Sequence, residues 1–229
     1  KITKSEGITM AYYDLGPYSR TVTTKSEEAQ LWFDRGLNWL FGYNHGEAIA
    51  CFKKAAEADP DCAMAYWGVA YATGPNYNLP WHLYDPKGRA MALAAAYEAA
   101  QEAKARTDKI TPVEKALIEA LDARYPQRDP IDDLMPWNKD YTNCMRKVLA
   151  DNPSDLDVQT VFVESIMNET PWKMWDLKTG GIAEDAGTAE AREILETSFR
   201  DVAESWDHPG LLHLYVHLME MSPFPELAL

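Results

Sequence analysis

Long apolar runs are missing from this sequence, and so are two motifs that mark common enzyme classes. No stretch reaches the roughly 18 to 20 consecutive apolar residues that a bilayer-spanning helix needs. No apolar segment follows the basic residues at positions 1–4, as a secretory signal would require. A glycine-rich phosphate-binding loop and a nucleophile motif around serine, cysteine or lysine are also missing. We therefore expect no membrane span, and nothing indicates nucleotide binding or covalent catalysis.

Cysteine is scarce, with Cys51, Cys62 and Cys144 as the three in 229 residues. Their odd number and their spacings match neither a disulfide framework nor a zinc finger. Free thiols in a reducing compartment explain them, which favours the cytoplasm. The glycosylation sequon at residues 168–170 indicates the opposite, although such tripeptides arise by chance and Pro171 follows this one.

Positive charge is also in short supply. The chain has 22 lysines and arginines against 36 aspartates and glutamates, for a formal net charge of −14. Nucleic acid and anionic membranes would be repelled by such a surface, so neither is expected as the main partner. Basic ligands and metal cations fit the charge better. The 46% hydrophobic content supplies ample material for a core.

Residues 29–60 predict two helices folded back on each other, and the rest of the chain can be placed relative to them. Each segment has one apolar stripe at a spacing of three to four residues. The stripes contain Trp32, Gly36 and Trp39 on the first segment and Ala48, Phe52, Ala55 and Ala56 on the second. Gly36 and Ala48 would let the two backbones approach closely. A polar turn at residues 44–46 separates the segments, and Pro60 ends the unit.

This order of large and small residues closely resembles a tetratricopeptide repeat, with a period of 32 residues before the next unit opens at Ala63. The resemblance implies an all-α fold, a tetratricopeptide-like α-solenoid of antiparallel helical hairpins with a concave groove. We expect an irregular arm over residues 1–25 and the repeat domain over residues 26–229. Residues 225–229 look like the start of another helix, so the repeats are expected to continue past Leu229.

Two aromatic insertions interrupt the repeats, at residues 74–88 and 171–187. Their tryptophans, Trp81, Trp172 and Trp175, bring apolar area that should be buried, so both loops are expected to be ordered. The phrases CAMAYWG, GPNYN and DHPGLLHLYVHLMEMSP resemble a group of microbial tetratricopeptide-containing proteins of poorly defined activity. In that group further repeats with more histidines follow, which leaves the ligand count of any site here open.

The prolines at positions 60, 153 and 209 each precede a first helix of a repeat. In tetratricopeptide repeats the residues four, seven and eleven positions later face the groove, and the resemblance carries this over. The groove would then be aromatic near its N-terminus and acidic and His-bearing near its C-terminus. The positions are Met64, Trp67 and Tyr71, then Asp157, Thr160 and Glu164, and finally His213, Val216 and Glu220.

His213 and His217 are one helical turn apart, so both imidazoles lie on one helix face. With a carboxylate from Glu220 or Glu164, such a pair can bind a divalent transition metal. Zinc is the default, because imidazole and carboxylate donors suit it, while iron or copper accept the same ligands. The alternative is that both histidines are satisfied core or groove residues. His208 belongs to the same cluster.

Other histidines point to local roles. His45 follows a helix turn, where capping of backbone groups is its expected role. His82 lies in the first insertion and either fixes that loop or reaches over the groove. We count His82 with Trp67, Tyr71, Asp157, Thr160 and His208 as groove or binding residues.

Two functions follow from these patterns. The first is a scaffold that binds a protein or basic peptide in the concave groove. The alternative is a metal-binding protein or metal-dependent enzyme whose insertions close over the groove. The sequence names no substrate and no oligomeric state.

Overall fold

The computed structural model describes residues 12–228, and within them the chain is all-helical. Two isolated bridges, Asn76 with Leu79 and Trp175 with Ile182, are the β structure in that part of the chain. The α-helices are α1 (Glu27–Phe41), α2 (His45–Ala58), α3 (Ala63–Thr73), α4 (Pro86–Lys104), α5 (Pro112–Arg124), α6 (Met135–Asp151), α7 (Leu156–Met167), α8 (Thr188–Asp201) and α9 (Pro209–Met219). Short 3₁₀ helices are η1 (Trp81–Leu83), η2 (Thr107–Lys109), η3 (Ala203–Asp207) and η4 (Pro225–Ala228).

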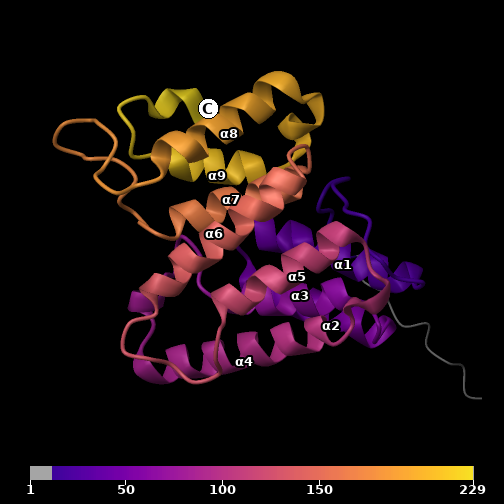
Figure 1. Cartoon of the computed structure of the whole chain (residues 1–229). Helices are drawn as coiled ribbons and strands as arrows, with labels where there is room; N and C mark the ends of the chain where they lie inside the picture. Colours follow the sequence, from indigo (N-terminus) through magenta and orange to yellow (C-terminus); the bar gives the residue numbers. More distant parts are fainter. Residues whose placement is uncertain (1–11, 229) are drawn as a thin grey trace, which may run out of the picture.

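Helices that follow each other in the chain pack on each other, from α1 through α9. Figure 1 shows the N-terminal helices α2, α3 and α4 at one end, α5 to α7 in the middle, and α8 and α9 at the other end. Alternate helices also touch, as α1 with α3 and α7 with α9. In addition α1 contacts α9, so the first and last α-helices are packed together. Among the described helices, none is long and apolar enough to cross a membrane.

Local signals place most helix ends. The side chain of Ser26 accepts a hydrogen bond from the backbone of Ala29 and so begins α1. Thr111 and Glu114 form a capping box at the start of α5, in the sequence order that is typical of this motif. The helix α4 begins at Pro86, within the stretch 74–88 that was expected to be an insertion, because Asp85 caps it. The helix α8 ends at Asp201, and the short η3 follows it.

Phe52 fills the close contact between the first three helices. A Cβ built on Gly36 of α1 would lie 2.6 Å from the Phe52 ring, and one built on Gly68 of α3 would lie 2.5 Å from it. Both glycines therefore give space to the same ring of α2. Ala48, also on α2, is fully buried, as a residue at a tight helix contact should be.

Gly36→Val is therefore expected to destabilise the protein by about 1–3 kcal/mol, because the added side chain must push the Phe52 ring aside. The midpoint of urea unfolding measures this. Gly46→Val is the matched control, since a Cβ at Gly46 meets no atom within 4 Å. Equal midpoints for the two variants would contradict the close contact.

Each insertion buries a tryptophan against the helices, whereas the tip of the second insertion projects away from them (Figure 1). Trp81 and Trp175 are buried, and the Trp175 indole donates a 2.6 Å hydrogen bond to the carbonyl of Leu218. The expectation of burial is wrong for Trp172, which is 41% exposed. Its ring stacks on Tyr77 of the first insertion, at 5.1 Å between ring centroids.

The expected N-terminal arm has no regular structure over residues 12–26, while residues 1–11 of it lie outside the described residues. Arg20 donates to both oxygens of Asp155, at 2.8 and 2.9 Å, and to Asp157 at 2.6 Å. Thr23 donates to Glu114 of α5. The arm therefore joins the start of α7 to α5.

Candidate functional site

His213 and His217 lie side by side on α9, as their spacing predicted. Their ring centroids are 4.8 Å apart and their planes differ by 27°. His208 is the N-cap of this helix, because its side chain accepts a hydrogen bond from the backbone of Leu211 at 3.2 Å, and Pro209 is the first helical residue. The ring of Tyr43, from the turn between α1 and α2, packs at 4.4 Å from His213 and 5.5 Å from His217. We call Tyr43, His213 and His217 the histidine site.

Both imidazoles are held through Nδ1. His213 Nδ1 lies 2.5 Å from the carbonyl oxygen of Phe41, and His217 Nδ1 lies 2.9 Å from a carboxylate oxygen of Glu220. Because these oxygens only accept, each Nδ1 carries a proton, and the lone pair of the neutral imidazole is then on Nε2. Among the described residues, the buried His217 Nε2 has no hydrogen-bond partner. Metal-binding histidines have this arrangement, with the second nitrogen donating to a carbonyl or carboxylate.

Electrostatics favour the neutral imidazole. Burial lowers the pKa of His213 below its usual value, and the neighbouring His217 adds to this effect, against the hydrogen bond to Phe41. Burial likewise lowers the pKa of His45, whose Nδ1 donates to the carbonyl of Tyr43 at 3.1 Å. His213 and His45 are therefore neutral near pH 7, the form in which an imidazole binds a metal.

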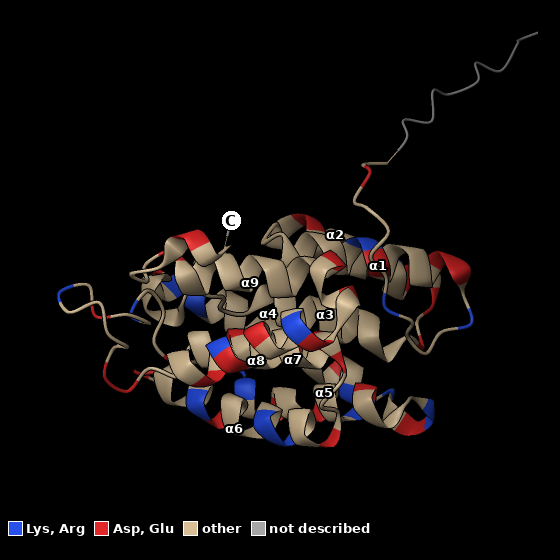
Figure 2. Ribbon diagram, turned by 90° about the horizontal axis from the view of Figure 1, so that it is seen from above, with Lys and Arg blue, Asp and Glu red and all other residues tan. Residues whose placement is uncertain are grey.

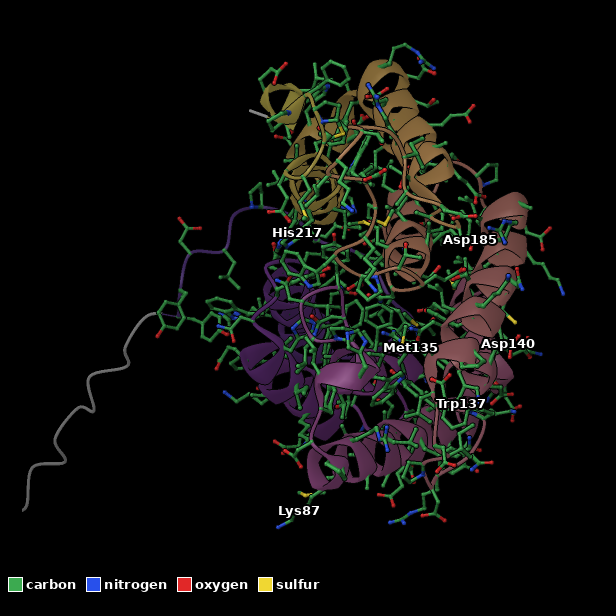
Figure 3. The ribbon with its side chains drawn as sticks, turned by 90° about the vertical axis from the view of Figure 1, so that its left-hand side faces the viewer. Lys87, Met135, Trp137, Asp140, Asp185 and His217 are labelled. Carbon is green, nitrogen blue, oxygen red and sulfur yellow. The ribbon has the colours of Figure 1, made fainter. Side chains whose placement is uncertain are left out.

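Both insertions reach the histidine site. Tyr77 of the first insertion packs at 5.3 Å from the His217 ring, and Trp172 of the second packs edge-on at 6.1 Å. Figure 3 shows His217 between the C-terminal helices and the N-terminal helices. Tyr43 and Trp172 also have positive φ angles, 58° and 62°. Bulky residues rarely adopt that conformation, and strain of this kind gathers at functional sites.

Charged residues are excluded from the helix that carries the site. No Lys, Arg, Asp or Glu occurs in α9, whereas α6 and α8 carry many, as Figure 2 shows. Glu220, which follows α9 directly, supplies the carboxylate beside His217.

The two predicted carboxylate ligands have other partners. Glu164 is 6% exposed and accepts hydrogen bonds from Tyr43 at 3.0 Å and from Tyr71. Glu220 holds Nδ1 of His217 and so orients that imidazole. Within the described part of the chain, no group of three or more His, Cys, Asp or Glu side chains is arranged to hold a metal. The structure thus brings the two histidines together. Glu220 is hydrogen-bonded to His217, whereas Glu164 is hydrogen-bonded to Tyr43, whose ring packs on both imidazoles.

A pocket of about 260 Å³ adjoins Tyr43 and His45. The first insertion and the end of α3 supply the rest of its wall. The residues that line it include no Lys, Arg, Asp or Glu. Burial lowers the pKa of His45, the one histidine among them, which favours its neutral form at pH 7. The lining residues are Tyr43, His45, Ala72, Gly74, Asn76, Asn78, Leu79 and Tyr84.

The predicted groove positions lie mostly in the interior. Buried side chains, with at most 9% exposure, are those of Trp67, Tyr71, Asp157, Thr160 and His208. Tyr18 of the arm covers two of them, because its hydroxyl donates to Asp157 and lies 3.0 Å from Nε2 of His208. His82, by contrast, is exposed on η1. Peptide binding in the groove stays a prediction, and a peptide would reach Asp157 and His208 only after Tyr18 of the arm moved away.

The arm contact makes stability depend on pH. Burial acts to raise the pKa of Asp157, but the hydrogen bond from His208 and the charge of Arg20 outweigh it and lower this pKa. An unfolded aspartate has a pKa of about 4. The contact therefore stabilises the fold above that pH, and its contribution is lost as the pH falls through the lower pKa of the folded state.

Asp157→Asn is accordingly expected to reduce the free energy of unfolding at pH 7 by about 1–3 kcal/mol, since charged hydrogen bonds are lost. The difference from the natural protein should shrink as the pH falls below about 4. Urea unfolding at several pH values measures both. A difference that does not change with pH would contradict the assigned role of the carboxylate.

Several side chains at this site were not predicted from the sequence. Tyr43 and Tyr77 gave no signal, because tyrosines in loops occur for many reasons. Arg124 gave no signal either, because it lies in the last turn of α5, where a basic residue is expected for its interaction with the helix dipole. The contact of His217 with Glu220 could have been predicted from the sequence, because residues three apart on a helix are neighbours.

Comparison of the chain with protein-family models, with curated proteins and with solved structures gives no significant match. The function therefore has to be argued from the site itself.

Proposed function

We propose that this chain is a metal-binding protein built on a tetratricopeptide-like α-solenoid, with a divalent transition metal held by Nε2 of His213 and of His217. Zinc is the default, and iron or copper suit the same nitrogen donors. The observation that carries the proposal is the pair of adjacent imidazoles whose Nδ1 atoms are both engaged, with His217 Nε2 buried and unpartnered in the described part of the chain.

The repeat architecture is supported by Gly36 and Gly68, which lie 32 residues apart and face the same Phe52 ring. That spacing equals the period of the repeat. The register is supported by Tyr71 and Glu164, which occupy the same offset after two different prolines and hydrogen-bond to each other. Both contacts are what neighbouring repeats with a common inner face would produce.

The metal proposal gives each nearby group a role. Glu220 orients His217 by accepting a hydrogen bond from its Nδ1, and the carbonyl of Phe41 accepts one from Nδ1 of His213. Tyr77 and Trp172 shield the histidines from solvent. The net charge of −14 favours cation binding over the whole surface.

Two protein ligands leave coordination positions for other donors. A metal bound in this way acts as a Lewis acid toward a molecule that enters the site, which is how a catalytic rather than a structural metal is used. The chain's own residues would bind and orient that molecule and keep water away.

Titration with cobalt(II) tests the proposal, because visible absorption bands report imidazole coordination of this ion directly. We expect saturation at one equivalent, and zinc should displace the cobalt and remove the bands. Absence of saturable absorption in the natural protein would overturn the metal proposal.

A further inference from the structure

Arg124 is a buried cation beside the histidine site. It is 2% exposed and lies at the end of α5. Its guanidinium carbon is 4.1 Å from the centroid of the Tyr71 ring and 5.0 Å from that of Tyr141. Nη2 donates a 2.6 Å hydrogen bond to the carbonyl of Pro75. Tyr71 in turn donates to Glu164, which connects Arg124 to the groups around Tyr43.

The charge of Arg124 has no direct counter-ion in the described part of the chain, where its side chain forms no ion pair within 4.0 Å. The nearby carboxylate of Glu164 is engaged by two phenols instead. Within the same residues, Nη1 of Arg124 and the hydroxyl of Tyr141 are buried and lack a hydrogen bond of good geometry. The guanidinium lies near enough to the phenol for a contact between them to oppose the burial that raises the pKa of Tyr141. A buried charge and buried donors without good hydrogen bonds are costly, so they indicate a group that the protein is built to receive.

The pocket beside His45 borders the loop that Arg124 contacts, and neither Arg124 nor Tyr141 is among the residues that line it. Pro75, which accepts the hydrogen bond from Arg124, lies between Gly74 and Asn76, both of which line the pocket. No aspartate or glutamate is among the residues that line it. At about 260 Å³, the pocket is smaller than the roughly 300–1,000 Å³ of sites for drug-sized ligands. It therefore suits a molecule of a few heavy atoms.

We propose that Arg124 and Tyr141 form a subsite for a small monocarboxylate, which receives hydrogen bonds from Nη1 and from the phenol. A carboxylate fits because its two oxygens can accept one charge-assisted hydrogen bond from Nη1 and one hydrogen bond from the phenol, and its single charge is opposite to that of Arg124. The second charge of a phosphate would be repelled by Glu164. The inference rests on the proposed function in one respect, that this carboxylate is the molecule that enters beside the metal.

Isothermal titration calorimetry with acetate tests the subsite, on the metal-free protein and in a buffer without other carboxylates. The natural protein should bind acetate saturably, and equimolar phosphate should not compete. Tyr141→Phe, which keeps the ring, should weaken acetate binding by about 2–10-fold, the effect of one lost hydrogen bond. Arg124→Gln should weaken it further. Arg128→Gln is the control, because Arg128 is exposed and pairs with Glu98 at the surface.

The outcomes separate this inference from the metal proposal. Cobalt binding without acetate binding overturns the carboxylate subsite and leaves the metal proposal intact. Acetate binding that Tyr141→Phe weakens supports the subsite even if no metal binds. If Arg124→Gln does not fold, Tyr141→Phe decides alone, and unchanged acetate affinity in that variant overturns the inference.

Discussion

Alanine at both His213 and His217 is expected to reduce the bound zinc from one equivalent to background. Each substitution removes one Nε2 donor, and the structure shows no third donor arranged to replace them within residues 12–228. Mass-spectrometric metal analysis after dialysis against a zinc-buffered solution measures the content. Glu220→Gln, which weakens the acceptor for His217 Nδ1, should lower zinc affinity by about 10–100-fold without abolishing binding.

The matched control for this experiment is His82→Ala. His82 is exposed on η1, so its removal should leave the zinc content unchanged. Circular dichroism confirms that each variant is folded. A folded double variant that keeps its zinc would show that the metal binds elsewhere.

Leucine in place of Glu164 is expected to destabilise the fold by about 3–5 kcal/mol, as removal of one partner from a buried charged network does. The hydroxyls of Tyr43 and Tyr71 would lose their acceptor, and Arg124 would lose a nearby negative charge. The free energy of urea unfolding measures the effect. Glu164→Gln keeps one oxygen acceptor and should cost less, about 1–3 kcal/mol.

Glu119→Gln is the control for the unfolding measurements on the Glu164 variants. Glu119 is exposed on α5 and lies 3.8 Å from Lys115, so its loss should change the free energy of unfolding by less than about 1 kcal/mol. A Glu164→Leu variant as stable as the control would contradict the central role given to Glu164.

The helices could be predicted because their signals are local. The apolar spacing of residues 29–60, the capping box at Thr111 and the prolines at positions 60, 153 and 209 act within a few residues of the chain. Predicted and observed ends differ by a few residues where a cap such as Asp85 begins a helix early. The all-helical class followed from these signals, whereas the solenoid stays a proposal.

The histidine pair could be predicted for the same reason, since one helical turn separates His213 from His217. The partners of Glu164 could not. Tyr43 and Tyr71 lie 121 and 93 residues away from it, and only tertiary packing brings them together. Repeat register alone also did not reveal that Asp157 and His208 are covered, because Tyr18 reaches them from a segment without regular structure.

Anomalous X-ray scattering tests the metal centre most directly. Crystals of the natural protein grown with zinc would be measured at energies just above and just below the zinc absorption edge. We predict one strong anomalous peak at about 2.0–2.1 Å from Nε2 of His213 and of His217. A zinc peak away from these two nitrogens, or none with both side chains well ordered, would contradict the proposed function.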